Sequence, residues 1–63
     1  MRVNGKVRSG EPVSVRALLD ELALDGRGIA IARNGEVVPR SSWESEMVGG
    51  EDVIEIVTAA AGG

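Results

Sequence analysis

Residues 14–26 of this 63-residue chain read "SVRALLDELALDG", and this stretch decides the fold because it predicts an amphipathic helix. Its apolar side chains fall at the i, i+3, i+4 and i+7 positions of one helix face: Val15, Leu18, Leu19 and Leu22. Ser14 is a good N-cap, and Gly26 is expected to stop the helix. Because one apolar stripe can cover only one side of a sheet, the sequence predicts a single helix packed across a single sheet.

Two Asn-Gly pairs on either side of this helix predict tight β-hairpins. Asn4–Gly5 separates two short strands that we place at residues 1–3 and 6–8, and Asn34–Gly35 forms the second turn. Asn-Gly is typical of two-residue hairpin turns because both turn positions need a positive φ. Pro39 should end the second hairpin, since proline has no N–H for the ladder of a sheet.

The segment after Pro39 predicts a short helical turn and then a final strand. Ser41 and Glu44 have the spacing of a capping box, which would place Trp43 and Met47 one helical turn apart. We expect Trp43, the one aromatic residue, to lie in the core, and Arg40 to be solvated. The β-branched run Val53–Thr58 predicts the last strand.

The resulting order is hairpin, helix, hairpin, short helical turn and strand. This order predicts the α+β class and a β-grasp (ubiquitin-like) roll, in which one main helix packs across a mixed sheet of four to five strands. We expect a β-grasp domain over residues 1–58 and a flexible C-terminal tail over residues 59–63, ending in Gly-Gly.

Composition excludes several classes of function. The chain has no cysteine and no histidine, which excludes disulfides, a Cys/His zinc site and any catalytic triad with an imidazole base. A chain this short has no room for a deep substrate pocket, so we do not expect an enzyme. Acidic residues such as Glu51 and Asp52 are expected to form a turn, and we predict no metal site and no bound cofactor.

Charge and hydropathy bear on partners and location. The seven basic residues are scattered and the net charge is −3, so we expect no nucleic-acid partner. No stretch of about 18 apolar residues is present to span a membrane. The opening "MRVNGKVRSGEP" turns polar too early for a signal peptide, and we therefore expect a cytoplasmic protein.

The last five residues offer no side chain that could anchor them to a core: Ala59, Ala60, Ala61, Gly62 and Gly63. Such a segment can pass through a narrow groove, and five extended residues reach about 16–18 Å, far enough to enter another protein's active site. A final glycine also leaves the terminal carboxylate unhindered by a β-carbon. We therefore expect the chain from Thr58 to Gly62 to thread into partner proteins.

Over nearly its whole length the chain resembles the ThiS-type sulfur-carrier proteins of thiamine (thiazole) biosynthesis. The resemblance is carried by four stretches: "VNG" at 3–5, "VRALLDELAL" at 15–24, "NGEVVPRSSW" at 34–43 and "EDVIEIVTAAAGG" at 51–63. It departs from the family in its short first strand and in the three alanines before the glycines.

The resemblance implies a protein co-substrate that performs no catalysis itself. In this family a partner adenylating enzyme uses ATP to activate the terminal glycine, here Gly63. Sulfur from a persulfide, supplied by a cysteine desulfurase or another donor, then displaces AMP. The resulting thiocarboxylate at Gly63 would donate sulfur to thiazole synthase during ring formation.

The last strand also offers a candidate docking face. Alternation places Ile54 and Ile56 on one face, and Val53 and Val57 with Glu55 on the other. The face with Val53 and Val57 could be exposed for docking, or the strand could be central and buried on both sides.

Two other functions fit the same residues. The first is a β-grasp sulfur carrier for another pathway, such as molybdopterin or cysteine synthesis. The second is a ubiquitin-like conjugation or docking module that performs no sulfur chemistry. Only the first of these two would need the glycine pair to carry sulfur.

Overall fold

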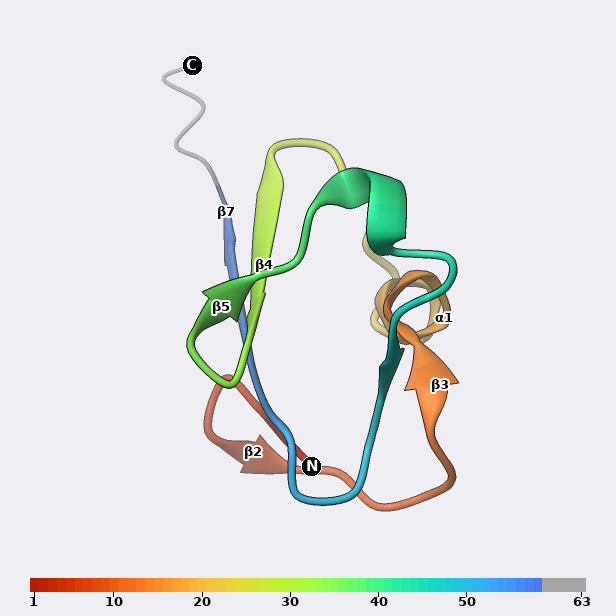
Figure 1. Cartoon of the computed structure of the whole chain (residues 1–63), viewed down its shortest axis with the longest axis vertical. Coiled ribbons are helices and arrows are strands. Elements are labelled where there is room, and N and C mark those ends of the chain that lie inside the picture. The colour runs from red at the N-terminus through yellow and green to blue at the C-terminus, as the bar shows by residue number, and fades with distance from the viewer. Residues whose placement is uncertain (59–63) are drawn as a thin grey trace.

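The computed structural model describes residues 1–58 and shows a sheet with one α-helix beside it (Figure 1). Within these residues α1 covers Val15–Glu21, and a short 3-10 helix covers Arg40–Ser42. The strands follow the chain as β1 (Arg2–Val3), β2 (Lys6–Val7), β3 (Val13–Ser14), β4 (Ile29–Arg33), β5 (Glu36–Val37), β6 (Met47–Val48) and β7 (Val53–Thr58).

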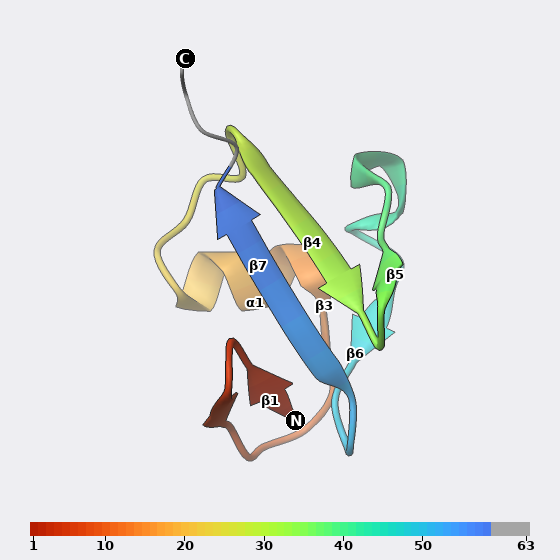
Figure 2. The ribbon, with the colours of Figure 1, turned by 90° about the vertical axis from the view of Figure 1, so that its left-hand side faces the viewer.

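Among the described residues, five strands form a mixed sheet in the order β2-β1-β7-β4-β5, with β7 in the centre. β7 runs parallel to β1 and antiparallel to β4, and β4 and β7 lie side by side across α1 (Figure 2). Ile31 of β4 faces Ile56 of β7 in this register. The predicted α+β roll, a mixed sheet crossed by one helix, is confirmed.

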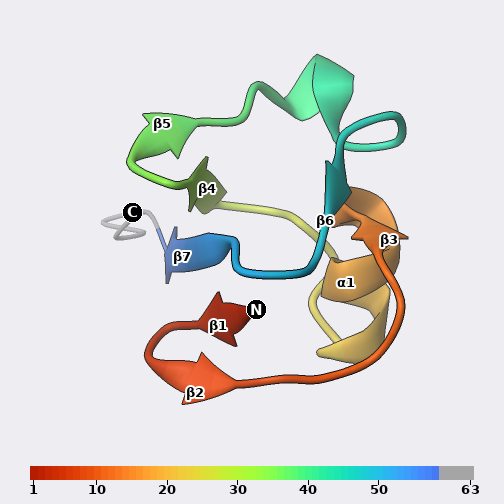
Figure 3. The ribbon, with the colours of Figure 1, turned by 60° about the horizontal axis from the view of Figure 1, so that its bottom comes forward.

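A second, two-stranded sheet was not predicted. β3 pairs antiparallel with β6 beside α1, with Val13 opposite Val48 and Ser14 opposite Met47 (Figure 3). The predicted short helical turn is present as the 3-10 helix, but it has no side-chain cap, so the predicted capping box is wrong. The predicted place of Met47, one helical turn after Trp43, is also wrong, because Met47 belongs to β6. Strand pairing prevails here because it satisfies the backbone groups of β6 and buries Val48 almost completely.

The core lies between α1 and the inner face of the sheet. Its buried apolar residues come from β1, α1, β4, β6, β7 and the segments on either side of the 3-10 helix: Val3, Val15, Leu18, Leu19, Ile31, Val38, Trp43, Val48 and Ile54. The indole Nε1 of Trp43 donates a hydrogen bond to the carbonyl of Val38 at 3.1 Å, which satisfies its one polar group. The prediction that Trp43 belongs to the core is confirmed.

The helix begins as predicted and ends earlier than predicted. The Ser14 hydroxyl accepts a hydrogen bond from the backbone N–H of Ala17 at 3.0 Å, which makes Ser14 the N-cap. At the other end Ala23 takes a left-handed φ of 62°. The Leu24 N–H then donates to the Leu19 carbonyl, and the Ala23 N–H to that of Asp20. These are the two bonds of a Schellman motif, so the helix ends before Gly26.

Gly26 is instead a packing position. It is buried with a φ of 90°, and a β-carbon there would lie 2.7 Å from the Arg16 guanidinium and 2.9 Å from the Trp43 ring. Its carbonyl accepts a hydrogen bond from Arg40 Nη2 at 2.6 Å, and the Arg40 guanidinium stacks 4.5 Å from the centre of the Trp43 ring. The expectation that Arg40 is merely solvated is wrong, because Arg40 fastens this loop to the core.

Both Asn-Gly turns hold the central strand. Asn4 and Asn34 have the expected positive φ values of 51° and 53°. The Asn4 side chain accepts from the Ile56 N–H at 2.8 Å and donates to the Ile56 carbonyl at 3.1 Å. The Asn34 side chain accepts from the Val53 N–H at 2.8 Å. Each side-chain amide therefore bonds to backbone groups of β7 that a neighbouring strand would otherwise pair with.

Asp52 fixes the turn that leads into β7. Its carboxylate accepts hydrogen bonds from Asn34 Nδ2 at 3.0 Å, from the Gly49 N–H at 3.0 Å and from Arg33 Nε at 3.2 Å. These bonds favour the ionised form, and they lower the pKa of Asp52, with the Asn34 bond contributing most. The expected role of Asp52 as a turn residue is confirmed.

Replacing Ala23 by glycine should stabilise the protein. Glycine adopts the left-handed conformation of this position without the steric cost that alanine pays. We expect Ala23→Gly to raise the free energy of unfolding by about 0.5–1 kcal/mol, measured by urea denaturation. Ala17→Gly, inside the same helix, is the matched control and should lower stability by a similar amount. A loss of stability in Ala23→Gly would contradict the assigned helix end.

The Asp52 network should make stability depend on pH in the acidic range. Because the pKa of Asp52 is lowered on folding, its contribution is complete above the unfolded value of about 3.9 and is lost as pH falls through the folded value. We expect Asp52→Asn to lower the free energy of unfolding by about 1 kcal/mol at pH 7. The difference in unfolding free energy between the variant and the unchanged protein should narrow as the pH falls below about 4. Urea melts across this range measure it, with Glu51→Gln as the control. A gap independent of pH would contradict the assignment.

Candidate functional site

The candidate site is the end of β7, which is also the end of the part of the chain that the structure describes. Thr58 is the last residue of β7 and lies opposite Ile29 of β4. The predicted modification site, Gly63, and the rest of the predicted tail lie outside the described residues: Ala59, Ala60, Ala61 and Gly62. The structure therefore shows the last residue before the predicted tail, which is an exposed residue at the end of the central strand.

The position of Thr58 is fixed by what holds β7. Ile54 anchors the strand in the core with no exposed surface. β4 pairs with β7 along its whole length, and Asn4 bonds to both backbone groups of Ile56 on the other side. Such pairing on two sides holds a strand firmly, so β7 has a defined place and direction in the sheet.

The outer sheet face, opposite α1, carries the two predicted docking residues. Val53 is 46% exposed and Val57 is 59% exposed, while Ile54 on the other face is fully buried. Among the described residues nothing covers this face of β7. Of the two arrangements that the sequence left open, the structure has the exposed one.

Two further valines extend this face, and sequence analysis missed both. Val7 of β2 shares the face because it lies opposite Arg2, which in turn lies opposite Val53. Val37 of β5 shares it through Ala32 of β4. Both valines are more than 70% exposed. The alternation of side chains along each hairpin strand could have identified Val7 and Val37 as residues of one sheet face. Placing them on the same face as Val53 and Val57 required the order of strands in the sheet.

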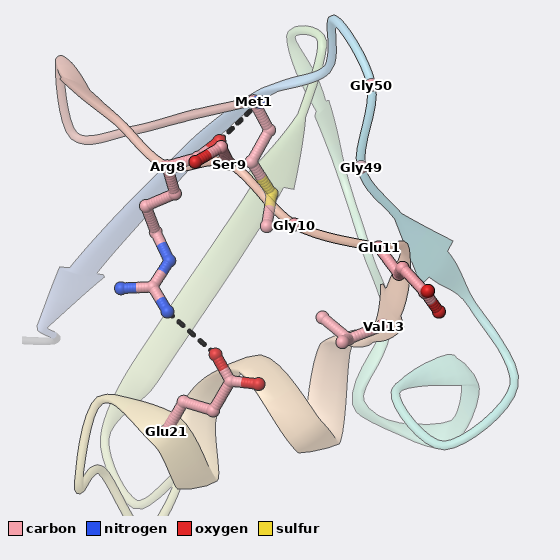
Figure 4. A pocket seen from close by; sticks show the side chains of 9 residues that line it. All are labelled: Met1, Arg8, Ser9, Gly10, Glu11, Val13, Glu21, Gly49 and Gly50. Atoms are coloured by element: carbon pink, nitrogen blue, oxygen red, sulfur yellow. Dashed lines mark hydrogen bonds and ion pairs between the residues drawn. The ribbon is translucent and has the colours of Figure 1, made fainter.

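A hollow of about 190 Å³ lies between the N-terminal segment, α1 and the loop before β7 (Figure 4). Arg8 donates a hydrogen bond to Glu21 across it at 2.7 Å, and the Met1 amino group donates to the Arg8 carbonyl at 3.0 Å. The two side-chain charges neutralise one another as an ion pair. This small polar hollow lies beside the start of β7 and takes no part in the candidate site.

The described part of the chain contains no group of three or more metal-binding side chains. Within it, no helix has the length and apolar character needed to cross a membrane. The Arg33 guanidinium bonds to Glu46 at 2.8 Å and to Asp52 at 3.2 Å, and these carboxylates raise its pKa. Arg33 thus ties β4 to the loops around β7, which is a structural role.

Known proteins are similar to this chain in sequence and in fold. A thiazole synthase of Paramagnetospirillum magneticum is 42% identical over 62 residues, which are 97% of this chain and 19% of that protein. The chain thus spans about a fifth of the length of that relative. The uncharacterized protein ycf40 of Porphyra purpurea is 31% identical over 64 residues, covering 100% of this chain and 90% of that protein.

Among solved structures, the crystal structure of the thiamine biosynthesis protein ThiS from Geobacter metallireducens superimposes with a TM-score of 0.80. The two chains are 30% identical, and the match covers 98% of this chain and 96% of the other. The model of the ThiS family matches residues 1–63. This chain therefore belongs to the ThiS family.

Proposed function

We propose that this chain is a sulfur carrier in thiamine biosynthesis and that Gly63 carries the sulfur. The observation behind the proposal is the ThiS family match, which extends through Gly62 and Gly63. The fold supports it, because β7 leads from the buried Ile54 to an exposed end at Thr58. A tail that starts there could reach into a partner while the domain stays folded.

The proposed chemistry takes place at the carboxylate of Gly63. A carboxylate is a poor electrophile, so an adenylating enzyme would first use ATP to form an acyl-adenylate with release of pyrophosphate. The terminal sulfur of a persulfide would attack the acyl carbon and displace AMP. A thiol would then cleave the sulfur–sulfur bond of the acyl disulfide and leave a thiocarboxylate on Gly63. The chain itself would bind no cofactor and act as a co-substrate.

The proposed partners are the adenylating enzyme, thiazole synthase, and a cysteine desulfurase or another persulfide donor. The relative from Paramagnetospirillum magneticum supports thiazole synthase as the sulfur acceptor, because a segment similar to this chain lies within a protein of that name. The outer sheet face, with Val53 and Val57, would dock the adenylating enzyme.

Mass spectrometry of the protein from its own cells tests the sulfur chemistry. We expect exchange of one oxygen for sulfur at Gly63, located by fragmentation of the C-terminal peptide. Fragmentation is needed because oxidation of Met1 or Met47 adds a similar mass. The same peptide shows whether Gly63 is joined to a lysine of another protein through an amide bond, which would contradict the proposal.

Deletion of Gly63 is the matched control. The truncated protein should keep the melting temperature of the full chain, because the core residues that the structure describes lie within residues 3–54 and we expect the tail to take no part in the core. With ATP and the adenylating enzyme it should form no adenylate that a persulfide can convert into the thiocarboxylate. If the full chain formed neither an adenylate nor a thiocarboxylate, the sulfur proposal would fail, and a docking module would remain.

Introducing a charge on the outer sheet face should weaken docking of the adenylating enzyme. Val57→Lys places an ammonium group where an apolar contact is proposed, and we expect about a tenfold rise in Kd, equivalent to about 1.4 kcal/mol. Calorimetric titration measures it. Met47→Lys makes the same change at another exposed apolar residue, outside this face, and should leave Kd unchanged. Equal effects of the two variants would contradict docking on the outer sheet face.

A further inference from the structure

One side of β7 lacks a neighbouring strand near its end. β1 pairs with β7 at Val53 and Ile54, and the chain then turns away at Asn4–Gly5. The Asn4 side chain reaches one step further, to Ile56. Beyond Ile56, no strand among residues 1–58 lies beside β7 on this side.

The backbone of Thr58 points into this vacant position. The Ile54 carbonyl accepts from the Asn4 N–H at 2.9 Å, and both backbone groups of Ile56 bond to the Asn4 side chain. The backbone groups of every second strand residue point to the same side. The N–H and carbonyl of Thr58 therefore face the β1 side of β7, beyond the point where β1 ends, and those of Val57 face β4.

Beneath this vacant position lies an open, mainly apolar hollow of about 330 Å³. The residues that line it come from the β1–β2 hairpin, the end of α1 and β7: Val3, Asn4, Lys6, Leu22, Leu24 and Ile56. Leu22, Leu24 and Ile56 remain partly exposed there, although they pack against the core. This is the surface that another strand beside β7 would cover.

The hollow also has a positive charge at its rim. Lys6 lies opposite Val3 in the hairpin, which places its side chain on the inner face of the sheet, beside the hollow. Lys6 is exposed and has no carboxylate within 4.0 Å among residues 1–58. A segment that lies here would gain from an acidic side chain close to Lys6.

We propose that the adenylating enzyme adds a strand to the sheet at this position. An extended segment of the enzyme would pair with the N–H and carbonyl of Thr58 and place an apolar side chain over Leu22, Leu24 and Ile56. An acidic residue of the same segment would meet Lys6. The occupant is an extended backbone because the Thr58 groups, which have no partner among residues 1–58, are those of a strand. Such main-chain pairing is a known mode of peptide binding.

This inference rests on the proposed function, and it explains how the enzyme would set the conformation and direction of the chain where the tail begins. A strand paired with Thr58 keeps the chain extended at the last residue before the tail. Asn4 blocks the same groups of Ile56, so pairing can begin only at Thr58. The added strand would therefore have one register, which places Gly63 at a fixed distance along the enzyme surface.

Amide hydrogen exchange followed by NMR tests the proposal on the full chain, with and without its adenylating enzyme. The Thr58 amide should exchange rapidly in the free protein and at least about tenfold more slowly in the complex, as one added hydrogen bond implies. The Val57 amide, which faces β4, is the internal control and should be protected in both states. A Thr58 amide that stays unprotected in the complex would overturn the proposal.

Charge reversal at the rim gives a second test. Lys6→Glu should raise the Kd for the adenylating enzyme by about tenfold, whereas Arg27→Glu, an equal change at an exposed residue outside the hollow, should not. If Gly63 is adenylated but Thr58 stays unprotected, only the strand addition fails. If no complex and no adenylate form, the proposed function and this inference fail together.

Discussion

The structure depends on the placement of β7 in the middle of the sheet. This strand separates two hairpins that are distant in the sequence, and its residue Ile54 is fully buried against the helix. Because β1 has only two residues, backbone pairing alone would hold β7 weakly on the β1 side. The side chains of Asn4 and Asn34 supply the missing bonds, at Ile56 on one side and at Val53 on the other. Two residues that shape turns thus also set the register of the central strand.

Local signals predicted most of the fold. The apolar stripe of the helix, the two Asn-Gly turns and the β-branched last strand each depend on neighbouring residues, and each forms as predicted. The failures have non-local causes. Met47 belongs to a strand because β3 lies beside it, and the helix ends at Ala23 because Leu24 packs back onto the core with its Schellman bond. Glycine or asparagine usually occupies that left-handed position, so an alanine there gave no sequence signal for the end of the helix.

The candidate site was predictable in part. Alternation along β7 identified Val53 and Val57 as one face, whereas the tail expected after Thr58 lies outside the described residues and stays a prediction. The open edge beside Thr58 could not be predicted, since it depends on where β1 stops and on which strands are neighbours. The same holds for Arg40. Its contacts with Gly26 and Trp43 join two loops that only the folded chain brings together, and they hold the loop before β4, whose first residue, Ile29, lies opposite Thr58.

The parallel pairing of β1 with β7 joins the first strand of the chain to the last described one, and the bond between Asn4 and Ile56 closes a loop of 52 residues. Contacts of such long range slow folding, because most of the chain must be ordered before they can form. On the ribosome, the core would stay open until Ile54 has left the exit tunnel. Nascent chains that stop short of β7 would expose their apolar residues to chaperones and proteases. Any molecule that escapes this quality control already has β7 in place at the centre of its sheet.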